Sequence, residues 1–227
     1  MPGKKRADAA KRDALLRAAR KVFHQKGYYE TTVAAIASEA GVATGSFYSY
    51  FSSKESCFLG LVETLYELLM GAVLRERAKG VDTEAKLIAS VRAAVQVFLR
   101  EPELSRLVLG ALQSGQPVLR ARVLAIARDL TGLLTADLAE LQGASFPWGA
   151  AEVRARFLLG GLNWALSEHF TGAGKEDPRL TEEVLLAASQ AVVREARGVN
   201  ESSTRSRSGS REKPPRSLRK AEPHPSS

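Results

Sequence analysis

The chain has 227 residues, a net charge of +8 and one cysteine. A single cysteine excludes an internal disulfide, and no apolar run reaches the roughly 18 residues that a membrane span requires. The basic N-terminus is not followed by a hydrophobic segment, so we expect no signal peptide and a cytoplasmic protein.

The positive charge is concentrated at the two ends of the chain. Residues 1–12 hold five Lys or Arg and one Asp, whereas residues 199–227 hold seven Lys or Arg and three Glu. Basic ends are expected of a protein that neutralises phosphates, although charged tails also serve solubility alone. We expect residues 1–10 to form a disordered basic arm and residues 199–227 a disordered basic tail.

Two helices are predicted next, and they are separated by a short extended segment. Residues 11–26 form the first helix, which Gly27 ends. Thr31 or Thr32 then offers a hydroxyl as the N-cap of a second helix. Gly41 follows that helix, at a position where a left-handed backbone is least strained. The inner face of this second helix consists of Val33, Ile36, Ala37 and Ala40.

A further short helix is expected to begin at Thr44, which we assign as its cap, with Phe47 and Phe51 facing inward. Its outward face carries no charge, whereas a solvated face normally carries Lys or Glu. Such a face favours close approach to a partner, and a helix-turn-helix presents its second helix to the DNA major groove. A helical hairpin within an all-α core remains the alternative. The outward residues are Thr44, Gly45, Ser46, Tyr48, Ser49 and Tyr50.

The segment from about Lys11 to Leu61 resembles the DNA-binding domain of the tetracycline-repressor (TetR) family of bacterial transcription regulators. The resemblance departs from the family pattern at Cys57, where the family usually has Leu. The matching motifs are Leu16-x-x-Ala19-x-x-Val22-Phe23-x-x-x-Gly27-Tyr28, Thr31-Thr32-Val33-x-x-Ile36-Ala37-x-x-Ala40-Gly41-Val42 and Gly45-x-Phe47-Tyr48-x-Tyr50-Phe51-x-Ser53-Lys54-Glu55.

The resemblance implies specific DNA contacts. Thr32, Tyr48 and Lys54 would bind phosphates, and Ser and Thr side chains at the start of the reading helix would meet base edges. Ser52 and Glu55 have the spacing of a capping box at the start of the next helix. The residues expected at the DNA interface are Thr32, Ala43, Thr44, Gly45, Ser46, Tyr48, Ser49, Tyr50 and Lys54.

The rest of the chain has helical periodicity and no strand-like alternation, so we predict an all-α protein of about nine helices. An N-terminal three-helix DNA-binding domain (residues 11–57) would precede a helical effector-binding and dimerisation domain (residues 58–198). The later helices are expected at residues 52–78, 83–100, 102–112, 118–141 and 150–170, with another from about residue 177.

Small residues in the last two helices indicate close approach of another backbone. The resemblance implies a four-helix seam between two copies, and packing within one chain is the alternative. The expected dimerisation residues are Gly160, Gly161, Ala165, Ala188 and Ala191.

The resemblance also implies that the second domain encloses a pocket for a small effector. Each candidate lining residue has an alternative as ordinary core or surface. The candidates are the apolar Phe98, Leu112, Leu134 and Trp164, with Gln113, Asn163 or His169 as polar anchors.

No catalytic constellation is recognisable. The three histidines, His24, His169 and His224, lack metal-ligand spacing, and no phosphate-binding loop or nucleophile motif is present. We therefore predict no enzyme, no metal and no cofactor. We expect a homodimeric repressor that binds a palindromic operator and is released by a small hydrophobic effector. A constitutive or protein-regulated DNA binder and a helical interaction module remain alternatives.

Overall fold

The computed structural model describes residues 2–111, 116–143, 148–171, 182–183 and 186–194. All regular structure in these residues is α-helical, which confirms the predicted fold class. The helices are α1 (Pro2–Glu30), α2 (Val33–Glu39), α3 (Thr44–Tyr48), α4 (Lys54–Arg77), α5 (Thr83–Arg100), α6 (Pro102–Ala111), α7 (Pro117–Gln142) and α8 (Trp148–Thr171), followed by helical residues 186–194.

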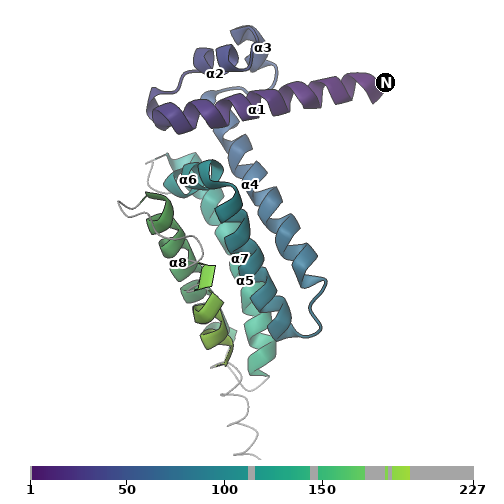
Figure 1. Ribbon diagram of the computed structural model, residues 1–227, viewed down its shortest axis with the longest axis vertical. Helices are drawn as coiled ribbons and strands as arrows, with labels where there is room; N and C mark the ends of the chain where they lie inside the picture. The colour runs from purple at the N-terminus through teal and green to yellow at the C-terminus, as the bar shows by residue number, and fades with distance from the viewer. Residues whose placement is uncertain (1, 112–115, 144–147, 172–181, 184–185, 195–227) are drawn as a thin grey trace, which may run out of the picture.

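Helices α1 to α3 form a small head at one end of the molecule, and α4 leads from it into a bundle made with α5 to α8 (Figure 1). The head begins with a helix that departs from our prediction, because α1 starts at Pro2 and residues 1–10 are therefore not a disordered arm from Pro2 onward. Proline suits the first position of a helix, and Lys, Arg and Ala after it are strong helix formers. Gly27 interrupts α1 as predicted, with φ of 74°.

Two hydrophobic cores hold the molecule together. The first, which we call the head core, joins buried side chains of α1 to α4 to five residues of the bundle. The second, the bundle core, joins α4 to α8. The five bundle residues in the head core are Leu104, Val108, Ala111, Leu119 and Ile126.

Helix α4 contributes side chains to both cores. Its length and apolar composition alone would suit a membrane span. Eight of its residues are buried, however, which is typical of the core helix of a folded protein. The helix thus connects the head rigidly to the bundle, since its 24 residues run without interruption.

Ion pairs reinforce the bundle at its far end and along α7. Arg77 of α4 forms a two-pronged contact with Asp137 of α7, in which Nη2 lies 2.8 Å from Oδ1. Arg122 of α7 makes a similar contact with Glu63 of α4. These pairs fix α4 against α7, on either side of a cavity described below.

Candidate nucleic-acid interface and ligand cavity

Helices α2 and α3 are set at their angle by a cap and a tight turn. Thr32 is the N-cap of α2, and its Oγ1 accepts a hydrogen bond of 3.1 Å from the Ala35 amide. Gly41 has φ of 68°, and the Val42 amide beyond it donates to the carbonyl of Ala37 at 2.9 Å. The structure thus selects Thr32 as the cap and confirms the turn at Gly41.

Helix α3 is anchored from below by aromatic side chains. Phe47 and Phe51 are buried, with ring centroids 5.6 Å apart. A methyl group added at Gly60 of α4 would lie 2.9 Å from Leu16 and 3.3 Å from Phe51. Glycine at this position therefore allows α1, α4 and the end of the α3 segment to approach closely, which holds α3 firmly in place.

The opposite side of α3 faces solvent and carries no charge. Ala43 is the N-cap of α3 and makes no side-chain capping bond, so our assignment of Thr44 as the cap was wrong. Thr44 is instead the first helical residue, and its side chain is exposed. Tyr50 is half-buried, and its hydroxyl lies 3.5 Å from a carboxylate oxygen of Asp8. Of the expected DNA-interface residues, Thr32, Ala43, Thr44, Gly45, Ser46, Tyr48 and Ser49 are exposed.

Lys54, at the start of α4, ties the head together. Its Nζ donates to the carbonyls of Tyr28 at 3.0 Å and Tyr29 at 3.2 Å. The same ammonium lies 4.8 Å from the centroid of the Tyr28 ring. The Tyr28 hydroxyl in turn donates to Glu55 at 2.8 Å. Burial and this hydrogen bond raise the pKa of Tyr28.

The capping box of α4 uses different residues from those we predicted. Ser53 is the N-cap, and it exchanges hydrogen bonds of 3.2 Å with Ser56 through the backbone amide and hydroxyl of each. Ser52 and Glu55 share a spacing that also fits a box, but Glu55 is engaged by Tyr28. Glu55 thus bonds a residue distant in the sequence, which local spacing did not predict.

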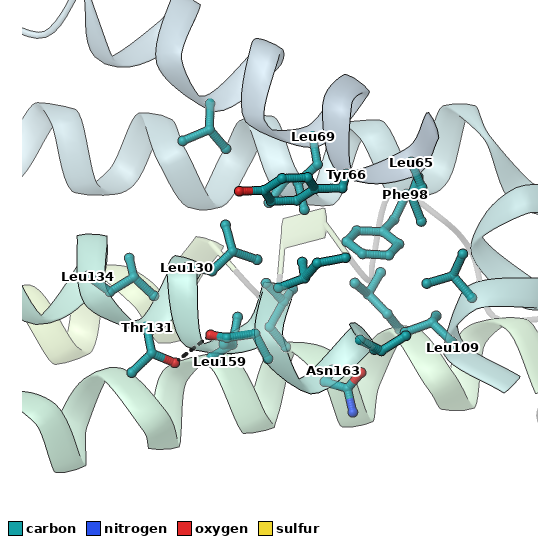
Figure 2. A pocket seen from close by; sticks show the side chains of 18 of the residues that line it. Leu65, Tyr66, Leu69, Phe98, Leu109, Leu130, Thr131, Leu134, Leu159 and Asn163 are labelled. Carbon is teal, nitrogen blue, oxygen red and sulfur yellow. Dashed lines mark hydrogen bonds between the residues drawn. The ribbon is translucent and has the colours of Figure 1, made fainter. Parts of the chain in front are cut away.

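The bundle encloses a cavity of about 320 Å³ between α4, α5, α6, α7 and α8 (Figure 2). Its walls are mostly Leu, Val, Ile and Ala, with Phe98 and Tyr66 as aromatic members. Four wall residues, Val62, Leu65, Val108 and Ile126, also belong to the head core. A molecule in the cavity would therefore touch side chains that support the DNA-binding head.

Three of the predicted effector residues line this cavity: Phe98, Leu134 and Asn163. Trp164 does not line it, since its side chain is 68% exposed on the outer face of α8, so we remove it from the candidate site. Leu112 and Gln113 lie outside the described residues. Lining residues that our sequence analysis missed include Tyr66, Leu109, Thr131 and Arg156.

Residues 15–61 match the family model described as "Bacterial regulatory proteins, tetR family". The match covers the second half of α1, all of α2 and α3, and the start of α4. The head thus has the DNA-binding segment of the TetR family. The chain is a helix-turn-helix transcription regulator, as the TetR-family resemblance implied.

Curated relatives and solved structures extend this similarity beyond the head. The chain is 37% identical over 70 residues to the uncharacterized regulator YuxN of Bacillus subtilis, which covers 31% of this chain and 24% of YuxN. It is 27% identical over 165 residues to the regulator RutR of Escherichia coli, covering 73% of this chain and 76% of RutR. The TetR-family regulator SCO4454 of Streptomyces coelicolor superposes with a TM-score of 0.69 at 24% identity, covering 83% and 97% of the two chains.

The outer face of α8, where we expect the TetR-family dimer seam, is unusually apolar. Gly160 and Gly161 are exposed, and a methyl group added to either would meet no atom within 4 Å. In the described part of the chain no other segment packs on these glycines, so the alternative of packing within one chain has no support there. Ala165 is half-buried, whereas Ala188 and Ala191 are exposed. The large exposed side chains on this face are Val153, Phe157 and Trp164.

Proposed function

We propose that this regulator binds a two-fold symmetric operator as a homodimer in the cytoplasm, represses transcription there, and releases DNA when a small hydrophobic effector fills the cavity. The observation that carries the proposal is that the cavity and the DNA-binding head share wall residues, Val108 and Ile126 among them. Occupancy of the cavity is then coupled to the position of the head.

Binding of DNA is supported by the exposed, uncharged face of α3. Thr44 and Ser46 offer hydroxyls that can bond to either donors or acceptors on base edges. Tyr48 is 56% exposed, and its ring packs edge-on against Phe47, which fixes the direction of its hydroxyl. A hydroxyl held in this way is suited to a backbone phosphate.

Dimerisation is supported by the apolar outer face of α8. Val153, Phe157 and Trp164 are each at least 67% exposed. They follow one another at intervals of four and seven residues, so they share one side of the helix with Gly160. A second copy packed on this side would bury all of them, and the glycines would allow its helices to come close.

Release of DNA by a ligand is supported by the position of α6, which lies between the cavity and α1. Val108 and Leu109 of α6 line the cavity. On the side of α1, Arg20 donates to Glu101 at 2.7 Å and to Glu103 at 3.0 Å. A shift of α6 would thus be passed to α1. Two heads must lie about 34–36 Å apart to enter successive major grooves, so a small shift would weaken binding.

The test is selection of binding sites from random double-stranded DNA at roughly 150 mM salt, with Tyr48→Phe as the binding variant. Tyr66→Phe makes the same change in the cavity wall, outside the exposed face of α3, and is the matched control. We expect a two-fold symmetric site whose affinity falls in Tyr48→Phe alone. Binding without sequence preference would contradict the proposal.

Release is tested with the selected operator by titrating a hydrophobic metabolite panel and measuring both thermal stability and DNA affinity. A true effector raises the thermal stability by mass action and lowers the affinity for DNA. Operator binding that no cavity ligand alters would support a constitutive or protein-regulated DNA binder instead.

A further inference from the structure

The hydrogen-bond donors in the cavity walls are almost all used within the protein. The Ser90 hydroxyl donates to the carbonyl of Lys86 at 2.7 Å and accepts a bond of 3.0 Å from Arg77. The Thr131 hydroxyl donates to the carbonyl of Ala127 at 2.8 Å (Figure 2). A carbonyl can only accept, so both hydroxyl protons are committed.

Tyr66 and Arg156 are also engaged. The Tyr66 hydroxyl lies 3.2 Å from a carboxylate oxygen of Asp129, to which it donates. Arg156 is the one charged side chain among the described lining residues, and its guanidinium pairs with Glu152 at 2.5 Å. The side chain of Arg156 is 70% exposed, so water and Glu152 together screen its charge, and the cavity interior holds no net cation.

Asn163 differs from these four residues. It lines the cavity from α8, is half-buried, and its side chain makes no hydrogen bond in the part of the chain that the structure describes (Figure 2). Its amide offers two N–H donors and one acceptor oxygen. Asn163 is therefore the cavity-wall residue whose uncharged N–H donors have no acceptor in the described part of the protein.

From this inventory we infer that the ligand is an uncharged, mainly hydrocarbon molecule with one carbonyl or hydroxyl oxygen, held by the Asn163 amide. The inference rests on the proposed function only in taking this cavity as the effector site. The walls offer a charged group no unpaired partner, and an unpaired charge is costly to bury. A neutral oxygen needs one donor, which Asn163 supplies. The volume of about 320 Å³ lies near the lower end for ligand pockets, so the molecule is small.

The binding experiment compares probes of equal chain length: decanol, methyl octyl ketone, decanoate and decylamine. Affinity is measured by thermal shift and calorimetry on the full chain without DNA. We expect decanol and the ketone to bind, with decanoate and decylamine at least about tenfold weaker. Decanoate or decylamine binding as tightly as decanol would overturn the inference, as would the failure of both neutral probes to bind.

The role of Asn163 is tested with Asn163→Leu, which keeps the number and branching of the side-chain heavy atoms and removes the amide. We expect about tenfold weaker binding of decanol and the ketone. Toluene has no polar group and serves as the ligand control, whose affinity should be retained. Equal decanol affinity in Asn163→Leu and the wild type would show that this side chain is not the anchor.

A gain of function tests the charge argument. Glu152→Gln frees Arg156 from its partner, so decanoate should now bind about tenfold more tightly than to the wild type. Glu168→Gln makes the same charge change on an exposed part of α8 outside the cavity wall. It should leave the affinity for decanoate unchanged. Unchanged decanoate affinity in Glu152→Gln would contradict the account of why the cavity rejects anions.

Failure of the proposed function has a separate signature. If decanol binds through Asn163 but operator affinity stays the same, effector release is wrong and the ligand class stands. If a charged ligand releases the operator while decanol does not bind, the ligand class is wrong and the regulatory proposal stands.

Discussion

Lys54 Nζ donates a hydrogen bond of 3.0 Å to the carbonyl oxygen of Tyr28 and lies 4.8 Å from the centroid of the same residue's ring. Lys54 begins α4, and Tyr28 follows the break in α1 at Gly27. The Lys54 ammonium, at the start of α4, thus gives a hydrogen bond to a carbonyl near the end of α1. A residue that the TetR-family resemblance assigns to DNA phosphate also holds the head together.

Lys54→Met should therefore have two separable effects. Loss of the carbonyl and ring contacts should lower the free energy of unfolding by about 1–2 kcal/mol, measured by urea denaturation without DNA. If Lys54 also contacts a phosphate, the slope of log affinity against log salt should fall by about one. Lys79→Met, at a lysine 70% exposed near the end of α4, is the control. Unchanged stability with a reduced slope would mean that Lys54 serves DNA alone.

Arg20→Glu should separate α1 from α6. The variant places a negative charge beside Glu101 and Glu103, which Arg20 now contacts at 2.7 and 3.0 Å. Because these groups are about a third to a half exposed, we expect a loss of about 1 kcal/mol in the free energy of unfolding. Arg17→Glu, an exposed change on the same helix, should have little effect. Equal losses in both variants would show that the contact between α1 and α6 is unimportant.

The head should lose stability in acid partly through Glu55. Its own backbone amide, the Ser53 side chain and the Tyr28 hydroxyl lower its pKa below the usual value of 4.5. A carboxylate with a lower pKa in the folded state stabilises fully above the unfolded pKa and loses that contribution as pH falls through the folded value. Glu55→Gln should flatten this acid limb in melting curves recorded from about pH 5 downward. Glu67→Gln, on the exposed side of α4, should leave the acid limb steep.

Cys57 should be chemically inert in the folded protein. It is fully buried in the head core, and burial raises the pKa of its thiol to about 12. A buried thiol with so little thiolate reacts only when the head opens. The rate of alkylation by iodoacetamide should therefore be that of the unfolded chain multiplied by the fraction of molecules in which the head is open. Rapid alkylation of the native protein, with a change in DNA binding, would instead indicate a redox-sensing thiol.

Local signals predicted most of the helices. Helix α5 was expected over residues 83–100 and is found at Thr83–Arg100, because Asp82 caps its start and Pro102 follows its end. Thr32, Gly41 and the inward Phe47 were likewise determined by neighbours within a few residues. Such features depend on backbone chemistry that a short stretch of sequence specifies by itself.

Features that depend on distant partners could not be predicted in this way. The capping box forms between Ser53 and Ser56, whereas the Glu55 carboxylate accepts a hydrogen bond from Tyr28, 27 residues away. Trp164 and Asn163 are adjacent in the sequence, yet one faces outward and the other lines the cavity. Which side of α8 faces the bundle depends on how the helices pack together, and the periodicity of α8 alone does not contain that information.

Val108 and Ile126 are buried in the head core and also form part of the cavity wall. A substitution at either position that suits a new ligand would change the support of the DNA-binding head at the same time. Changes of ligand preference are then less costly at Thr131, Leu134 and Leu159, which line the cavity without belonging to the head core. Substitutions that adapt the cavity to new effectors are accordingly tolerated best at those three positions. Val108 and Ile126 tolerate fewer changes, because they also support the DNA-binding head.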